Sequence, residues 1–577
     1  MLMTDFLHKV DQLAVSMNKE QLVGFIHNEA RILNENDRRE FLTRLSEFAD
    51  SADEKPKDHE PEQAFDLSSL YEKLELIKNG EAVLTSECNE EYDDWYNDEE
   101  DPYIYHDTEH IADTVLSACQ MIHALIDWEK YDDAVQLAKT LLELSIEVES
   151  EYEDEQTFYL DDLFEYGLIS ADYEKIVLDM LYAAYMALPL PERAETIYRF
   201  MESSECRGIN LEKLMQHSDR ELLNIPEFLD CWTEFLCNQS GSLTESLLRE
   251  SVAMITDNEK LVHYAEKYGA VHPCIYDALL EKNPFADTKK AVQTGIRALE
   301  IIPAHYKIRS NIALMTAKYA LTSNDTEKAE YCWLEAFRSC PTATNLLRLM
   351  TMYGNFSKIE QEVRTIISAH DTNKQQSAYV SGKANELNSY YFGNEDKYKL
   401  LFLLGDYMDV LKKGMKAQKT LGWSYTFLEC GIPLFFLLMY NHTQLNGAML
   451  QMCMTASEHM SFHAKDYCRG TQQSENNDTL LFWDLFRQTR GPEKLSDEER
   501  QKIMEKLNTL TELRTNLIVS EQKRGYYNEC ASYIAALGEV LESHGKNGSK
   551  QALLSAYKSK FPRHSAFIRE LKNFGLK

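Results

Sequence analysis

Residues 291–303, AVQTGIRALEIIP, decide the fold, because the same spacing recurs 38 residues later as AEYCWLEAFRSCP at residues 329–341. Each copy has alanine at its first and eighth positions and proline at its thirteenth. Small side chains two helical turns apart lie on one face, where they let a second helix approach closely, and the proline ends the helix. The positions on this face are Ala291, Gly295 and Ala298 in the first copy and Ala329, Trp333 and Ala336 in the second.

This small–large–small–Pro spacing resembles the second helix of a tetratricopeptide repeat, and a period of about 34 to 40 residues is typical of helical-hairpin solenoids. Four weaker copies carry parts of the pattern: Tyr131–Ala138, Ala194 with Tyr198, Leu404–Tyr407, and Gly525–Tyr527 with Ala531. The resemblance implies an all-α fold, an α-solenoid of tetratricopeptide-like hairpins with a small N-terminal helical segment. The alternative is a non-repeating bundle of ordinary amphipathic helices.

The composition agrees with a large helical protein. Of the 577 residues only 22 are Gly and 13 are Pro, well below the usual fractions of about 7% and 5%. A β-sandwich, barrel or propeller needs more turn-forming residues than this. Hydrophobic residues make up 44% of the chain, which excludes global disorder.

The charge limits the partners. Sixty Lys and Arg face 95 Asp and Glu, for a formal net charge of −35, which repels nucleic acids and anionic membrane surfaces. The exception is the C-terminal end, where residues 546–577 contain eight basic residues and one acidic residue, Glu570. This end could bind an acidic partner or the protein's own acidic face. The alternative is a solvated last helix.

The chain is expected to have four parts. Residues 1–50 are predicted as an N-terminal helical hairpin, and residues 51–106 as a linker, a short helix and an acidic loop. Residues 107–395 are the N-terminal part of the predicted solenoid, and residues 396–577 are its C-terminal part with a basic last helix. Met1–Val10 lack the apolar core of a signal peptide. The apolar stretch 432–440 is too short for a membrane span.

The cysteines and two longer segments suggest a cytoplasmic, bacterial-type protein. The twelve cysteines form no C-x-C or C-x-x-C pair, as expected of reduced, mostly buried thiols. Residues 421–435 and 561–571 resemble the helical-repeat region of bacterial SWIM zinc-finger proteins. The C-x-C…C-x-H metal motif of that family is absent from the sequence, so neither its zinc finger nor a nucleic-acid role transfers to this chain.

One motif suggests zinc chemistry. His106-Asp107-Thr108-Glu109-His110 has the form H-x-x-E-H. On a helix, His106 and His110 would share one face and could hold zinc, and Glu109 could act as a general base. The alternative is the start of a helix with surface histidines. The same sequence lacks both common glycine-rich phosphate loops and a G-x-S-x-G nucleophile motif.

A second set has metal-ligating residue types at unusual spacing: Cys453, His459, His463 and Cys468. At about 100° per residue, one straight helix presents the thiols and the imidazoles on opposite sides. A metal site here would need a break in the helix. The alternative is buried thiols with partly exposed histidines.

An acidic and aromatic segment is the candidate partner-binding region. Residues 90–101, EEYDDWYNDEED, contain eight carboxylates, and aromatic residues continue to residue 105. Rings supply buried area and charges steer the approach of a basic protein. The alternatives are a solvated loop and an imitation of a nucleic-acid backbone. The candidate residues are Tyr92, Trp95, Tyr96, Tyr103 and Tyr105.

We therefore expect a non-enzymatic scaffold or adaptor that binds a protein on the concave face of a solenoid, with no cofactor and no membrane. Aromatic residues such as Trp333 and Tyr353 are expected mostly in the core, with some lining that face. The rival functions are a zinc-dependent hydrolase using His106, Glu109 and His110, and an acidic mimic that occupies a nucleic-acid-binding protein. The sequence leaves the partner and the oligomeric state open.

Overall fold

A computed structural model describes most of the chain: residues 67–88, 103–150, 156–203, 206, 208–217, 222–283, 285, 287–377, 392–393, 395–416, 423, 426–445 and 447–577. The chain divides into two compact units, residues 1–83 and 84–577. In the first, the described part contains helix α4 (Leu67–Lys78), which lies within residues 51–106, where a short helix is expected. The predicted hairpin over residues 1–50 lies outside the described residues. The boundaries expected at residues 50, 106 and 395 stay predictions.

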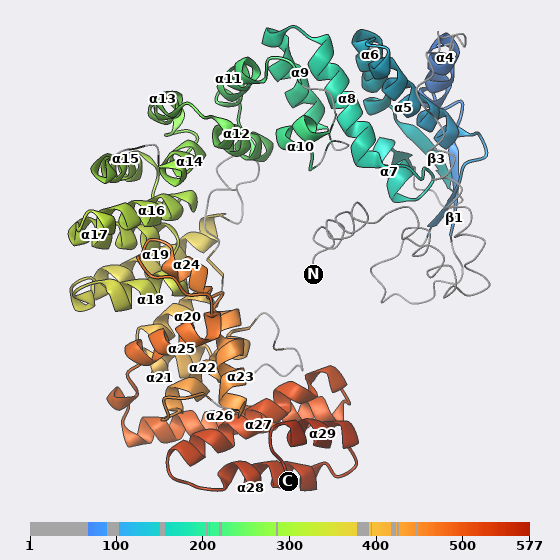
Figure 1. Cartoon of the computed structure of the whole chain (residues 1–577). Coiled ribbons are helices and arrows are strands. Elements are labelled where there is room, and N and C mark those ends of the chain that lie inside the picture. The colour runs from blue at the N-terminus through green and yellow to red at the C-terminus, as the bar shows by residue number, and fades with distance from the viewer. Residues whose placement is uncertain are drawn as a thin grey trace, which may run out of the picture. The chain divides into compact units, whose positions relative to one another are not determined.

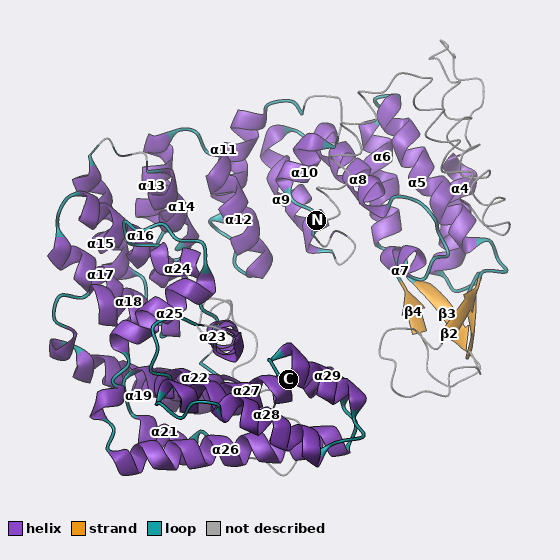
Figure 2. Ribbon diagram, turned by 60° about the horizontal axis from the view of Figure 1, so that its bottom comes forward, coloured by secondary structure: helices purple, strands orange, loops and turns teal. Residues whose placement is uncertain are grey.

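The described part of the second unit is mostly helical, but it begins with a small sheet that corrects the all-α expectation (Figures 1 and 2). The sheet has the order β2-β1-β3-β4, with β1 parallel to β3 and antiparallel to β2, and with β4 antiparallel to β3. A parallel pair needs a crossover connection, and two helices, α5 and α6, supply it. The strands are β1 (Leu84–Cys88), β2 (Tyr103–His106), β3 (Ile146–Ser150) and β4 (Gln156–Phe158).

Helices α5 and α6 form a hairpin whose second helix starts at Tyr131, the beginning of one of the weaker repeat copies. Ala134 and Ala138 of that helix are both fully buried. The following helices pack mainly on near neighbours in the sequence. The bounds in this part are α5 (Ile111–Asp127), α6 (Tyr131–Leu142), α7 (Leu160–Glu165), α8 (Tyr173–Ala187), α9 (Leu190–Glu202), α10 (Leu211–Gln216), α11 (Ile225–Leu236), α12 (Ser242–Met254), α13 (Asn258–Tyr268) and α14 (Cys274–Lys282).

The two copies of the repeated stretch form α15 and α17, and both pack against α16, which lies between them in the sequence. Ala291, Ala298, Ala329 and Ala336 are fully buried, and Trp333 is almost so. A Cβ atom added at Gly295 would lie 2.8 Å from Cβ of Thr316 on α16. The small residues therefore lie where two helix backbones come close. The bounds here are α15 (Thr288–Ile301), α16 (Ile308–Thr322), α17 (Thr326–Ser339), α18 (Ala343–Met352), η2 (Phe356–Lys358) and α19 (Glu360–Ser377).

The last part is built around α22 and α27, two helices with mostly buried residues. The turn Leu404–Tyr407 joins α20 to α21, and Gly405 adopts the positive φ of 89° that this tight connection requires. The bounds are α20 (Asp396–Leu403), α21 (Tyr407–Lys413), α22 (Phe427–Met439), α23 (Gly447–His459), α24 (Ala464–Cys468), α25 (Asp478–Thr489), η3 (Pro492–Lys494), α26 (Asp497–Ser520), η4 (Arg524–Tyr526), α27 (Tyr527–Ser543), α28 (Ser549–Lys560) and α29 (Ser565–Asn573).

Among the described helices, none combines the length and the apolar composition needed to cross a bilayer. This agrees with the short apolar stretch at residues 432–440, which lies in and just after α22.

Candidate docking groove and inner strap

An open groove of about 880 Å³ lies between α10, α11 and α12. Met215 on α10, Leu229 on α11, and Ala253 and Met254 on α12 give it an apolar floor. Its polar residues are Asn210, Glu212, Gln216, Ser246, Arg249 and Glu250. An apolar floor with a polar rim is the usual composition of a surface that binds a protein or peptide.

One end of α10 is held by a carboxylate from α12. Glu250 accepts the backbone N–H of Leu211 at 3.1 Å and that of Glu212 at 2.7 Å. The side chain of Asn210 accepts the N–H of Lys213 at 2.9 Å, so it caps the same helix. Burial raises the pKa of Glu250, although the two N–H donors act to lower it. The rim of the groove is therefore tied to its floor through the first turn of α10.

The other end of α10 is held by a buried carboxylate on α8. Asp179 is 8% exposed and lies between two histidines: 2.7 Å from Nε2 of His217, which follows α10, and 2.9 Å from Nδ1 of His123 on α5. Burial acts to raise the pKa of Asp179, but the hydrogen bonds from His217 and His123 outweigh it and lower that pKa. The carboxylate of Asp179 on α8 thus links α5 to the end of α10.

The floor of the groove is suited to an apolar side chain of a partner. Met215 is 39% exposed, and methionine side chains adapt to differently shaped partners because they are unbranched and polarizable. Arg249 is exposed and forms no ion pair within the part of the chain that the structure describes. It can therefore bind a carboxylate of a partner beside the apolar floor.

A surface formed by α16, α17 and α18 is covered by the chain itself. The segment 464–473, which contains α24 and which we call the strap, lies against α18 and reaches α16 and α17 (Figure 1). The indole nitrogen of Trp333 donates to the carbonyl oxygen of Gly470 at 2.9 Å. The hydroxyl groups of Thr351 and Tyr467 are 2.9 Å apart. Trp333, which the sequence places mostly in the core, is almost fully buried and binds this protein's own backbone.

Arg348 on α18 holds the strap through hydrogen bonds to its backbone. Its guanidinium group is buried and donates to the carbonyl oxygens of Asp466 and Tyr467 and to the side-chain oxygen of Asn345. Burial lowers the pKa of Arg348 to about 10. Carbonyl oxygens at the end of α24 are suitable acceptors for this charge because a helix C-terminus carries partial negative charge.

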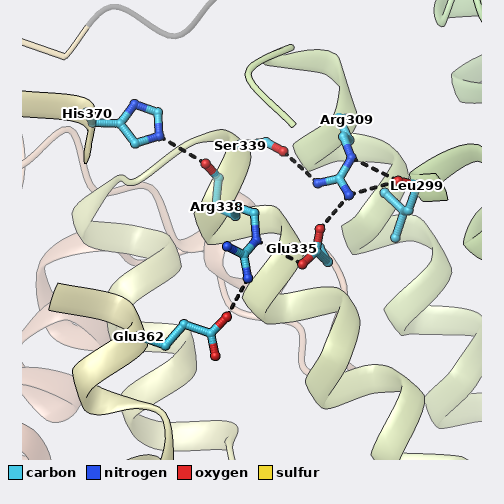
Figure 3. A network of polar contacts seen from close by, with 7 residues as sticks. All are labelled: Leu299, Arg309, Glu335, Arg338, Ser339, Glu362 and His370. Atoms are coloured by element: carbon cyan, nitrogen blue, oxygen red, sulfur yellow. Dashed lines mark hydrogen bonds and ion pairs between the residues drawn. The ribbon is translucent and has the colours of Figure 1, made fainter. Parts of the chain in front are cut away.

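A network of ion pairs and hydrogen bonds also joins the helices of this part of the chain (Figure 3). Arg309 on α16 donates to the carbonyl oxygen of Leu299 on α15 and to the carboxylate of Glu335 on α17. Arg338 bridges Glu335 and Glu362 on α19. The network therefore links α15, α16, α17 and α19.

The H-x-x-E-H motif does not lie on one helix, so the geometric premise of the zinc hypothesis is wrong. His106 is the last residue of β2, and its Nε2 atom lies 3.0 Å from Glu87. His110 precedes α5 with a positive φ of 56°, and its Nδ1 atom lies 3.1 Å from Asp113. Glu109 lies in the bend between these two elements. The strand and the turn point the two imidazoles to different carboxylates.

The Cys453 set is not brought together either. The buried Cys453 donates to the carbonyl oxygen of Thr479, and burial raises the pKa of its thiol to about 12. His459 lies 3.7 Å from Glu429, His463 lies 3.2 Å from Asp478, and Cys468 ends α24. Across the described residues, the structure holds no cluster of three or more His, Cys, Asp or Glu side chains that suits a metal ion.

The acidic and aromatic candidates fall in two groups. Tyr92, Trp95 and Tyr96 lie outside the described residues. Tyr103 and Tyr105 belong to β2, where Tyr105 packs 4.7 Å, between ring centroids, from both Phe158 and Tyr166. Tyr105 therefore takes part in the packing beside the sheet, and Tyr103 is exposed.

Sequence reasoning missed the groove residues Met215, Arg249 and Glu250. The segment Asn210–Glu212 carries a recognisable helix-capping residue, but nothing in the sequence joins it to α12. Comparisons with protein-family models, with curated proteins and with solved structures found no match. The tetratricopeptide-like and SWIM-like resemblances therefore stay predictions.

Proposed function

We propose that this protein is a non-enzymatic scaffold: a tetratricopeptide-like α-solenoid that binds a partner protein in the groove between α10, α11 and α12. The contacts of the helices support the architecture, because α12, α14 and α16 are successive neighbours and α15 and α17 pack against α16. Stacked hairpins of this kind bury one continuous core and offer an extended surface for binding.

The groove carries the proposal of a binding role. Its floor of Met215, Leu229 and Met254 offers apolar contact area, and its rim provides Arg249, an exposed cation that forms no ion pair with a described residue. The strap lies against α16, α17 and α18. There Trp333 and Arg348 donate hydrogen bonds to the backbone carbonyl oxygens of the strap. The groove between α10 and α12 is therefore the surface that we assign to the partner.

The chemistry of the groove favours a partner segment with one or two apolar anchors and a neighbouring carboxylate. An amphipathic helix presents such anchors at three- and four-residue spacing. Its apolar side chains would pack on the two methionines, and its carboxylate would pair with Arg249. Buried anchors contribute most of the binding energy in such complexes.

The test compares two variants that introduce the same charge at different sites. Met215→Glu with Met254→Glu places two carboxylates in the groove. The control is Leu450→Glu with Met454→Glu, because these residues on α23 are 37% and 46% exposed and lie outside the groove. Proteins captured from the native cell by the wild type and the control should be lost with the groove variant.

A captured protein is then purified, and its affinity is measured by calorimetry. We expect the groove variant to bind at least tenfold more weakly, which corresponds to about 1.4 kcal/mol, and the control to bind as the wild type does. Equal binding by the groove variant, with unchanged circular dichroism, would refute the assignment of the partner to this groove.

A further inference from the structure

Basic and acidic residues are distributed unevenly along the chain. Residues 546–577 carry eight basic residues and one acidic residue, a net charge of +7, and the preceding residues carry 52 basic and 94 acidic residues, a net charge of −42. The basic part contains α28 and α29, which pack on each other and on α27. We call these two helices and their connection the basic hairpin.

Only two of the eight basic side chains are paired with carboxylates in the described chain. Lys550 lies 2.6 Å from Glu539, and Lys560 lies 2.8 Å from Glu512. The other six are exposed and form no ion pair with a described carboxylate: Lys546, Lys558, Arg563, Arg569, Lys572 and Lys577. The two paired lysines hold the hairpin to the body, and the six others remain available to a partner.

The free charges on α29 share one face. Phe567 and Leu571 are buried, and Arg569 and Lys572, three residues apart, point away from them. Like charges at this spacing repel each other by a few tenths of a kcal/mol. An anionic partner removes that repulsion. The half-buried rings of Phe561 and Phe574 lie beside these residues in the sequence, so the surface combines charge with aromatic area.

The sequence contains an occupant with the complementary chemistry. Residues 89–102 contain eight carboxylates and three aromatic residues, Tyr92, Trp95 and Tyr96. The described residues on either side of it, Cys88 and Tyr103, pair across β1 and β2. The main helix neighbour of the strands is α7, whereas α28 and α29 pack on α27.

We propose that the basic hairpin binds the acidic segment 89–102 of a second copy of this chain. The rings of that segment add apolar contact, and its carboxylates pair with Arg563, Arg569 and Lys572. The net charge of −35 makes two copies repel each other. Salt at 0.15 M ionic strength screens this repulsion beyond a Debye length of about 8 Å. Charges in direct contact then decide the outcome. This surface is separate from the groove between α10 and α12.

The experiment measures the mass of the full chain by sedimentation velocity at several concentrations. The wild type should form a concentration-dependent dimer in 0.15 M NaCl, and its dissociation constant should rise at least tenfold in 0.5 M NaCl. The variant Arg563→Glu, Arg569→Glu, Lys572→Glu should stay monomeric. The control is Lys260→Glu, Lys267→Glu, Lys502→Glu, which changes the net charge by the same amount at lysines that already have partners and should dimerise as the wild type does.

A mixing experiment identifies the occupant. A second variant replaces the eight carboxylates of residues 90–101 by their amides, and alone it should be monomeric. An equimolar mixture with the hairpin variant should associate again, because each variant keeps the half that the other has lost. Thermal unfolding shows that both variants are folded.

Three results would overturn the proposal: a wild type that is monomeric at every concentration, a hairpin variant that dimerises like its control, or a mixture that stays monomeric. A peptide of residues 90–101 should inhibit dimerisation by occupying the basic hairpin, and a 20-base-pair DNA duplex should inhibit it less strongly. If the duplex competes better, the hairpin is a nucleic-acid site instead.

Discussion

The indole nitrogen of Trp333 and the carbonyl oxygen of Gly470 are 2.9 Å apart, although 137 residues separate them in the sequence. Gly470 has a positive φ of 78°, and a Cβ atom added there would lie 2.8 Å from the carbonyl oxygen of Leu314. The close approach of the strap to α16 and α17 therefore needs both a glycine in the strap and a hydrogen-bond donor on the helix that it covers.

Replacing Trp333 by Phe should loosen the strap. The change removes the indole N–H, which is the only hydrogen-bond donor of this side chain, so the Gly470 carbonyl oxygen loses its partner. Leaving a buried polar group without a hydrogen bond lowers the free energy of unfolding by about 1–3 kcal/mol. Urea unfolding should show this loss, and hydrogen exchange should accelerate at residues 464–473. The control is Trp128→Phe, because Trp128 is 42% exposed, and it should change stability by less than about 0.5 kcal/mol. Equal effects of the two changes would contradict a specific role for the indole.

The helices of the repeated stretch could be predicted because their information is local. Ala291 and Ala298 lie two turns apart on one helix, and this spacing alone predicts a close contact with another helix. The strap could not be predicted in the same way. Tyr467 and Arg348 have no shared period, and they meet only because α18, α24 and α25 pack together. Only the structure shows which helix packs on the face that carries Ala291. It is α16, whose Thr316 lies against Gly295.

Replacing Gly295 by Ala should destabilise the protein although alanine favours helices. The added Cβ atom would overlap Thr316, whose own Cβ would be 2.8 Å away, so α15 and α16 must move apart. Overpacking of this kind costs about 1–3 kcal/mol. Gly525→Ala is the matched control, because nothing lies within 4 Å of a Cβ atom there. Chemical denaturation measures both. A Gly295→Ala variant as stable as the control would show that α15 and α16 can move apart at little energetic cost.

Replacing Glu335 by Ala should cost more than removing an exposed acid. Glu335 is 7% exposed and serves Arg309 and Arg338 (Figure 3), so its loss leaves the buried Arg309 charge without a carboxylate. Breaking such a pair costs about 3–5 kcal/mol. The control Glu498→Ala removes an exposed partner of Lys502 and should cost about 0.5 kcal/mol or less. Urea denaturation distinguishes the two, and similar values would mean that water replaces Glu335 in the network.

The sheet and the zinc motif show where local reasoning failed. Ile146 and Val148 are buried while Glu147 and Glu149 are exposed, an alternation that predicts a strand. The run Tyr103–Tyr105 is also rich in strand-forming residues. These strands are short, and β1 pairs with β3 between residues 64 positions apart, as Leu84 with Val148, so their pairing depends on α5 and α6. Reading residues 106–110 as a helix ignored β2, which ends at His106.

The stability that Asp179 provides should depend on pH in a defined direction. Its pKa in the folded state is lowered, from an unfolded value of about 3.9. A depressed carboxyl pKa contributes stability that is complete above the unfolded value and is lost as the pH falls through the folded one. Asp179→Asn should therefore be less stable than the wild type by about 1–3 kcal/mol at pH 5 and above, because bonds to an ionised acceptor are lost.

The difference between Asp179→Asn and the wild type should shrink as the pH falls below about 4, since the wild-type carboxyl then takes up its proton. Urea unfolding at half-unit steps from pH 7 to pH 2.5 measures it. Asp113→Asn is the control, because Asp113 pairs with His110 on the surface, where its side chain is 79% exposed, and it should show little dependence. A stability difference for Asp179→Asn that stays constant over this range would mean that the packing of the side chain, rather than its charge, holds α5, α8 and the end of α10 together.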